Sequence, residues 1–206
     1  MLNLLKKLNL LRFVAHLLYP YIAEDHERRE AHALKEILSQ FKSCGRWYHI
    51  KSPYTLKGVK YISIGENFRT GAHLRLEAID SYGDETYSPE IIIGDDVVMQ
   101  ELCHIACVER ISIGSGTLLG SKVFISDHMH GDITTKDLDF RPELRKLSHK
   151  SVSIGENVWV GDGACILAGV TLDDNVIVGA NAVVTHSFPA NSVIAGCPAK
   201  LIKTLK

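Results

Sequence analysis

A six-residue period in the hydrophobic pattern dominates the second half of the chain. From residue 154 the sequence divides into IGENVW, VGDGAC, ILAGVT, LDDNVI, VGANAV and VTHSFP, and the first position of every unit is aliphatic. The fifth positions are mostly small or β-branched. A period of six matches neither the 3.6-residue turn of an α-helix nor a simple two-residue alternation. It favours a parallel β-helix, in which short strands alternate with corners and aliphatic side chains fill a narrow prism.

Related units recur upstream, at 64–81, 93–110 and 113–126. Ile93 and Ile113 are 20 residues apart instead of the 18 of three units, so one coil carries a two-residue insertion. The prism is therefore predicted to be interrupted before Ile93, within that coil and after Ser126. The longest interruption, 127–151, is polar and predicts a protruding loop, where functional groups are often found.

The first 42 residues follow a different pattern. Their hydrophobic residues recur three and four apart, and glycine is absent, which predicts helices. Pro20 is expected to end the first helix, and a second is expected from Ala23 to about Phe41. The predicted organisation is a helical segment at 1–45 followed by a β-helix domain at 50–206.

The role of the helical segment is open between two possibilities. Asn9, Arg12 and His16 interrupt its apolar stretch and no small-residue cleavage site follows, so it does not resemble a signal peptide. No uninterrupted apolar run approaches the ~20 residues of a membrane span. Docking on the rest of the protein or on a neighbouring subunit is favoured, and peripheral membrane contact is the alternative.

Composition narrows the class of protein. Hydrophobic residues make up 46% of the 206, enough for a sizeable core. Lys and Arg number 23 against 24 Asp and Glu, which argues against a nucleic-acid partner. The five cysteines are odd in number and form no C-x-x-C pair, so neither a disulfide framework nor a thiolate zinc site is expected, and a cytoplasmic location is favoured.

The six-residue units, aliphatic first, small or acidic second and small fifth, are similar to those of the hexapeptide-repeat acyltransferases. The resemblance covers about residues 50–206. It implies a left-handed parallel β-helix with three units per coil, whereas ordinary crossover connections are right-handed. It also implies a homotrimer with active sites between neighbouring prisms.

One segment inside the predicted loop carries the most specific resemblance. Ser126-Asp127-His128-Met129-His130-Gly131 is similar to the S-D-H-x-H-G segment of the maltose, galactoside and O-antigen acetyltransferase branch. The resemblance implies that His128 is the general base, and a group titrating near pH 6.5 suits that task. Asp127 or a backbone carbonyl is expected to fix the imidazole tautomer. His130 is expected to contact substrate or to shape the loop.

The C-terminal segment resembles the branch's coenzyme A groove and implies acetyl-CoA as cosubstrate, with no metal. Beyond Asp174 the sequence holds no acidic residue, so the last coil is locally positive and suited to phosphates. The alternative is that its lysines only solubilise the C-terminal cap. His186 stands where the branch has lysine, and Trp159 is expected either to wall the channel or to anchor a trimer interface. The implied cofactor contacts are Trp159, Asp162, Ala180, Thr185, His186, Lys200 and Lys203.

The acceptor side departs from the branch. Gln100, followed by Glu101, occupies the position where galactoside and maltose enzymes have an asparagine that holds the acceptor hydroxyl, so a different acceptor is expected. The polar, tyrosine-containing stretch 78–90 has the composition of a sugar-binding rim, although it also suits a solvated loop.

The leading hypothesis is a coenzyme A-dependent O-acetyltransferase that modifies a sugar hydroxyl in surface polysaccharide or lipopolysaccharide assembly. A γ-type carbonic anhydrase is a weaker alternative, with His104, His128 and His130 as metal ligands, because its wide spacing followed by H-x-x-x-x-H is absent. A non-catalytic trimeric scaffold is the third hypothesis.

Overall fold

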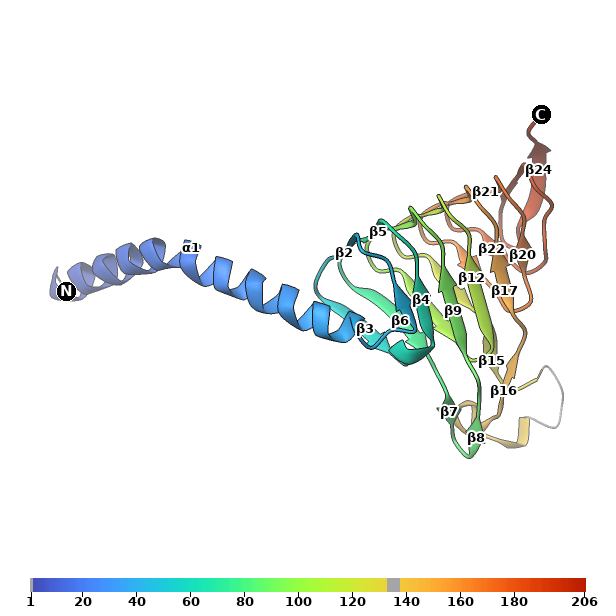
Figure 1. Cartoon of the computed structure of the whole chain (residues 1–206), viewed down its shortest axis with the longest axis horizontal. Helices are drawn as coiled ribbons and strands as arrows, with labels where there is room; N and C mark the ends of the chain where they lie inside the picture. The colour runs from blue at the N-terminus through green and yellow to red at the C-terminus, as the bar shows by residue number, and fades with distance from the viewer. Residues whose placement is uncertain (1, 133–137) are drawn as a thin grey trace. The chain divides into compact units, whose positions relative to one another are not determined.

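The six-residue units form rungs of three parallel sheets in the computed structural model, which describes residues 2–132 and 138–206. Within the N-terminal helix, the side chains of 2–11, 13, 26 and 27 lie outside the description. The chain divides into two compact units, one up to Ser39 and one of Gln40–Lys206. The larger unit is a left-handed parallel β-helix, as the resemblance to the hexapeptide-repeat acyltransferases implies (Figure 1).

Each coil passes through sheets A, B and C in turn. Sheet A contains β1 (Ser43–Cys44), β4 (Ile62–Ile64), β9 (Glu90–Ile93), β12 (Arg110–Ile113), β17 (Val152–Ile154) and β20 (Thr171–Leu172). Sheet B contains β2 (Tyr48–Ile50), β5 (Phe68–Thr70), β10 (Val98–Met99), β13 (Leu118–Leu119), β18 (Trp159–Val160), β21 (Ile177–Val178), β23 (Ser192–Ala195) and β24 (Lys200–Thr204). Sheet C contains β3 (Tyr54–Lys57), β6 (Leu74–Ala78), β11 (His104–Cys107), β14 (Phe124–Ser126), β19 (Cys165–Ile166) and β22 (Val183–Val184). A short 3-10 helix, η1 (Val59–Tyr61), follows β3.

The first position of each unit builds the core. In sheet A these residues lie in register on neighbouring rungs, and none is more than 3% exposed: Ile64, Ile93, Ile113, Ile154 and Leu172. Sheet C repeats the arrangement with Leu76, Ile105, Ile125, Ile166 and Val184. The hexad pattern therefore predicts both the inward direction and the register of the strands, because each rung buries one aliphatic residue per face.

Two edges of the prism matter for function. The B/C edge comprises the corners between sheets B and C, at 71–73, 100–103, 120–123, 161–164 and 179–182. The C/A edge comprises the corners between sheets C and A, at 79–89, 108–109, 127–151, 167–170 and 185–187. Each face is about six residues wide, so the two edges lie up to about 20 Å apart at 3.3 Å per residue.

Both long interruptions leave the prism at the C/A edge and form antiparallel hairpins (Figure 1). The first consists of β7 (Ser81–Tyr82) and β8 (Glu85–Thr86). The second consists of β15 (His128–His130) and β16 (Leu147–His149), with the 3-10 helix η3 (Pro142–Leu144) between them. Residues 133–137 of the predicted loop 127–151 lie outside the described residues.

The N-terminal unit is a single helix, α1 (Leu2–Leu38), so the expected break into two helices at Pro20 is wrong. Proline removes one backbone hydrogen bond and crowds the preceding turn, but a long helix accommodates this by bending. Figure 1 shows a bend near the middle of α1. No helix in the described part of the chain is both long enough and apolar enough to cross a membrane.

Candidate active site

Asp127 and His128 lie where the chain leaves sheet C at the C/A edge. Strand β14 ends at Ser126, and His128 opens the hairpin strand β15. The side chain of Asp127 is fully buried, and that of His128 is 11% exposed. The transition from prism to hairpin thus holds one carboxylate in the interior and leaves the adjacent imidazole partly exposed.

A cradle of backbone amides holds the Asp127 carboxylate. Oδ1 accepts a hydrogen bond from Val108 N at 2.9 Å, and Oδ2 accepts from Glu109 N at 2.8 Å and Arg110 N at 2.9 Å. The Cys107 thiol also donates to Oδ2, over 3.2 Å. Burial and the nearby carboxylate raise the pKa of Cys107, so its thiol remains a protonated donor. Asp127 is therefore held in one orientation by donors alone.

This cradle keeps Asp127 ionised. Burial by itself favours the neutral acid, but the hydrogen bonds from His128, from the backbone and from Cys107 outweigh it and lower the pKa of Asp127. An ionised carboxylate has no proton to donate. Because His128 Nδ1 lies 2.9 Å from Asp127 Oδ1, Nδ1 must carry the proton of that hydrogen bond, and Nε2 is the basic nitrogen. The pair has the arrangement of a general base with its orienting acid.

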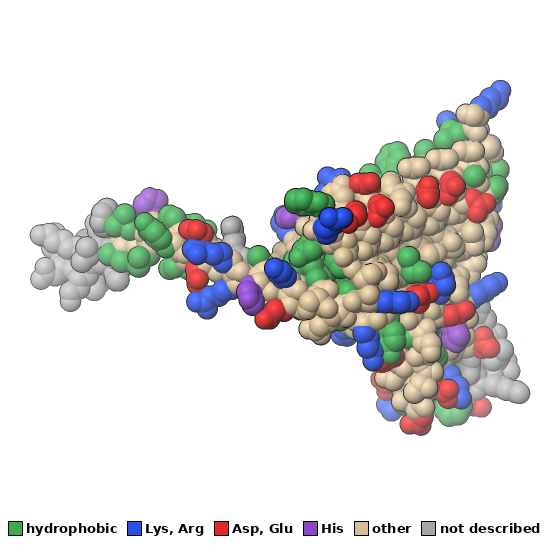
Figure 2. Space-filling view, in the orientation of Figure 1, with side chains coloured by type: hydrophobic (Ala, Val, Ile, Leu, Met, Phe, Trp, Pro, Cys, Tyr) green, Lys and Arg blue, Asp and Glu red, His purple; other side chains and the backbone are tan. Residues whose placement is uncertain are grey.

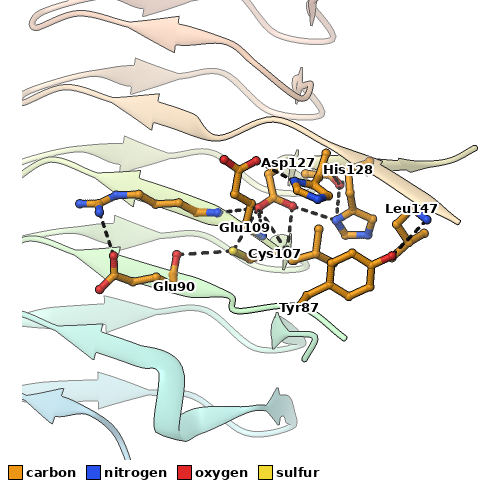
Figure 3. Close-up of polar contacts among 11 residues, drawn as sticks. Tyr87, Glu90, Cys107, Glu109, Asp127, His128 and Leu147 are labelled. Atoms are coloured by element: carbon orange, nitrogen blue, oxygen red, sulfur yellow. Dashed lines mark hydrogen bonds and ion pairs between the residues drawn. The ribbon is translucent and has the colours of Figure 1, made fainter. Parts of the chain in front are cut away.

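The corner that supplies the cradle is itself tied to the hairpin. Glu109 accepts from His149 Nδ1 at 2.8 Å and from Ser151 Oγ at 2.9 Å, and these contacts lower the pKa of Glu109. Figure 3 shows Cys107, Glu109 and Asp127 gathered between the prism and the hairpin. This cradle is an element of the candidate site that the sequence reasoning missed. Its signal was the two-residue insertion between Ile93 and Ile113, which falls at this corner and provides the extra amides.

A second histidine–carboxylate pair lies on the outer face of sheet C and was also missed. Glu77, whose side chain is 6% exposed, contacts Lys57 Nζ at 2.8 Å, Arg75 Nη2 at 2.7 Å and His104 Nε2 at 2.9 Å. Burial opposes ionisation of Glu77, but these three partners lower its pKa. Burial and the charge of Arg75 lower the pKa of His104, although its hydrogen bond to Glu77 acts in the opposite direction. The lowered pKa favours the neutral ring. No six-residue pattern distinguishes these outward positions.

The two hairpins support each other beside the dyad. Tyr82 donates from its hydroxyl to the Glu143 carbonyl oxygen at 2.7 Å, and its ring lies edge-on to His130 with centroids 5.2 Å apart. The Tyr87 hydroxyl accepts from Leu147 N at 3.3 Å (Figure 3). The tyrosines of the predicted sugar-binding rim thus bond to the second hairpin, and His130 lies in that contact.

The predicted acceptor contacts Gln100 and Glu101 lie elsewhere, on the B/C edge. Both are exposed and line a shallow groove of about 440 Å³ together with Lys51 and Arg69. Lys51 Nζ lies 3.8 Å from Glu101 Oε1. One face of the prism therefore separates these residues from Asp127 and His128 within a single chain.

The predicted cofactor contacts are divided in the same way. Asp162 and Ala180 are exposed on the B/C edge, where Asp162 Oδ1 accepts from Ser121 N at 2.9 Å. Thr185 and His186 are exposed on the C/A edge, the edge of the dyad. The remaining three contacts lie in sheet B: Trp159 is 52% exposed on β18, and Lys200 and Lys203 are exposed on β24.

The histidines of the carbonic anhydrase hypothesis have separate partners. His104 pairs with Glu77, His128 pairs with Asp127, and His130 packs against Tyr82. Among the residues that the structure describes, no group of three or more His, Cys, Asp or Glu side chains is arranged to hold a metal ion.

Comparison with known proteins places this geometry in a family. Residues 151–186 match the family model described as bacterial transferase hexapeptide (six repeats). The chain is 40% identical over 158 residues to an Escherichia coli protein named as the lipopolysaccharide biosynthesis O-acetyl transferase WbbJ, covering 75% of this chain and 77% of that one. It is 34% identical over 182 residues to the galactoside O-acetyltransferase of Escherichia coli, covering 87% and 70%.

Solved structures agree with this relationship. A maltose O-acetyltransferase from Clostridium difficile superposes with a TM-score of 0.52 at 26% identity, covering 82% of this chain and 73% of that one. The Bacillus cereus N-acyltransferase AntD, in complex with a dTDP-amino sugar and coenzyme A, shares the fold with a TM-score of 0.68 at 19% identity, covering 85% and 89%. The repeat, the prism and the relatives together show that the chain belongs to the hexapeptide-repeat acetyltransferases.

Proposed function

We propose that the protein transfers the acetyl group of acetyl-CoA to a sugar hydroxyl during surface polysaccharide or lipopolysaccharide assembly in the cytoplasm. The observation that carries the proposal is the Asp127–His128 pair, which leaves Nε2 as a base at an edge of the prism. The similarity to WbbJ and to a galactoside O-acetyltransferase supports the choice of an acetyl donor and a glycan acceptor.

The chemistry proposed for His128 is one proton transfer in each direction. Nε2 takes the proton of the acceptor hydroxyl as the oxygen attacks the thioester carbonyl carbon. The carbon–sulfur bond then breaks, and the leaving thiolate takes the proton back from Nε2. Asp127 stabilises the imidazolium between the two transfers, and a backbone amide is expected to polarise the thioester carbonyl.

A reaction centre shared between two subunits follows from the distribution of the site residues. The acceptor contact Gln100 and the base His128 lie on different edges, up to about 20 Å apart across sheet C. We expect this separation to be too long for one acceptor hydroxyl to contact both residues of one chain. We therefore propose a homotrimer in which the C/A edge of one subunit faces the B/C edge of the next. The cofactor contacts on both edges would then line one groove, and Lys200 and Lys203 would meet the nucleotide phosphates.

The direct test of the activity is acetyl transfer by the purified protein. Acetyl-CoA is supplied with a panel of free and nucleotide-linked sugars that includes an amino sugar, and thiol release and product mass are measured. We expect an acceptor-dependent release of thiol and an ester product whose acetyl group is lost in mild alkali. An alkali-stable amide on the amino sugar alone would contradict O-acetylation, and no coenzyme A binding by calorimetry would favour the scaffold hypothesis.

The shared site predicts complementation between two defective subunits. Gln100→Ala is expected to lower activity about tenfold, the scale of one lost hydrogen bond, and His128→Ala to remove it. In cyclic trimers that contain both kinds of subunit, about one site in three regains both residues, so activity should rise about sevenfold above the mean of the parents. Differently tagged subunits purified in tandem provide the mixed trimers. Activity equal to the mean of the parents would contradict a site shared in this way.

A further inference from the structure

Helix α1 carries a stripe of exposed apolar side chains. Five large side chains on one helical face are between 42% and 72% exposed: Val14, Leu17, Leu18, Tyr21 and Ile22. Their spacing of three, four, seven and eight residues places them within one continuous arc of the helix. A contiguous exposed apolar surface of this kind is a feature of protein or membrane contact sites.

Charge along the helix is as unevenly distributed as hydrophobicity. The sequence has no acidic residue before Glu24, whereas Lys6, Lys7 and Arg12 are basic. Beyond the stripe the charged residues pair with one another: Arg28 lies 3.2 Å from Glu24, and Arg29 lies 2.8 Å from Asp25. Figure 2 shows the exposed hydrophobic side chains of α1 followed along the helix by this charged stretch. The apolar half of the helix is therefore also its cationic half.

We infer that the first half of α1 lies in the headgroup region of an anionic lipid bilayer. The stripe of Val14, Leu17, Leu18, Tyr21 and Ile22 enters the boundary of the acyl chains, and the positive charge of this half of the sequence favours an anionic surface. The tyrosine rings at positions 19 and 21 suit this depth, because an aromatic body with a polar tip is favoured at the interface. The inference is independent of the acetyl-transfer proposal, since it uses none of the residues of that site.

A second copy of the helix is the less suitable occupant of the stripe. After Ile22 the next positions on the same face include Asp25, and the stripe from Val14 to Ile22 covers little more than one heptad. A stable coiled coil requires at least three or four, and Pro20 lies within the stripe. Cationic charge without acidic partners also repels an identical helix, whereas it attracts an anionic surface.

The test is sedimentation of the full chain with lipid vesicles. Wild-type protein should sediment with vesicles of phosphatidylglycerol and phosphatidylcholine, much less with phosphatidylcholine alone, and less at high salt. The double variant Leu17→Glu/Tyr21→Glu should bind at least about tenfold more weakly. Ala31→Glu/Ala33→Glu is the matched control, because it adds the same charge at exposed positions of the other half of α1 and should retain binding.

The outcomes that overturn the inference are distinct. Wild-type protein that stays in the supernatant with anionic vesicles overturns it, as does equal loss of binding in both double variants. If Leu17→Glu/Tyr21→Glu lowers the oligomer mass in light scattering without any vesicle binding by the wild type, the stripe is a contact between copies instead. Acetyl transfer to a dissolved acceptor is expected to be unchanged in this variant, so failure here is distinguishable from failure of the proposed activity.

Discussion

Replacing His128 with alanine is expected to lower kcat by about 10²–10⁴-fold, the contribution of a positioned general base. Nε2 of His128 is the basic nitrogen because Nδ1 is committed to Asp127 over 2.9 Å. Without the imidazole, the acceptor hydroxyl must lose its proton to water as attack begins. Steady-state rates with saturating acetyl-CoA and acceptor measure the loss.

The fold should survive this change. Asp127 loses one donor but keeps the amides of Val108, Glu109 and Arg110, so no uncompensated carboxylate is left in the interior. The melting temperature and the gel-filtration mass are therefore expected to stay close to those of the wild type. His32→Ala, at an exposed position of α1, is the control and should leave kcat unchanged. Wild-type turnover by a folded His128→Ala protein would disprove the assignment of the base.

The prism could be predicted from sequence because each of its rungs repeats the same requirement. A narrow prism accepts one aliphatic side chain per face, and Ile113, Ile154 and Leu172 meet that requirement on successive rungs of sheet A. Because the requirement is local and periodic, it is visible in a single sequence. Pro20 illustrates the opposite case, since a local rule predicted a break where the helix continues through the proline.

The site could be predicted only in part. The S-D-H-x-H-G resemblance identifies the dyad, because Asp127 and His128 are neighbours in sequence as well as in space. The amide cradle depends on a corner about 18 residues earlier in the chain, and the pair of His104 with Glu77 joins two rungs 27 residues apart. Such contacts depend on which residues of neighbouring coils pair with each other. That pairing can be assigned only when the positions of the insertions at the C/A edge are known.

The two-edge arrangement is a consequence of the same register. The family resemblance implied that Gln100 and His128 belong to one site, but it did not specify which edge of the prism each residue occupies. In the prism, residues that follow strands of sheet B lie on one edge and residues that follow strands of sheet C lie on the next. The separation is a property of the fold, and it makes an active site between subunits the simplest way to bring both residues to one acceptor.

Asp127→Asn is expected to impair both catalysis and stability, because neither orientation of the amide suits the cradle. If its nitrogen takes the place of Oδ2, it faces the N–H groups of Glu109 and Arg110, donor against donor. If it takes the place of Oδ1, it faces Val108 N–H and drives the proton of His128 from Nδ1 to Nε2, which removes the base. We expect kcat to fall by about 10²-fold or more and unfolding free energy to fall by about 1–3 kcal/mol.

The pH dependence of stability gives this prediction a second readout. The pKa of Asp127 is lower in the folded protein than the value of about 3.9 expected in the unfolded chain. Its contribution to stability is therefore fully present above about pH 4 and is lost as the pH falls through the folded-state value. The difference in unfolding free energy between wild type and Asp127→Asn should shrink on acidification, as measured by urea denaturation across this range.

Asp95→Asn is the matched control, since that exposed carboxylate also accepts a backbone N–H, from Glu66 at 2.7 Å, but lies far from His128 in the coil. A pH-independent difference, or equal losses of activity in the two variants, would show that the cradle does not maintain the base.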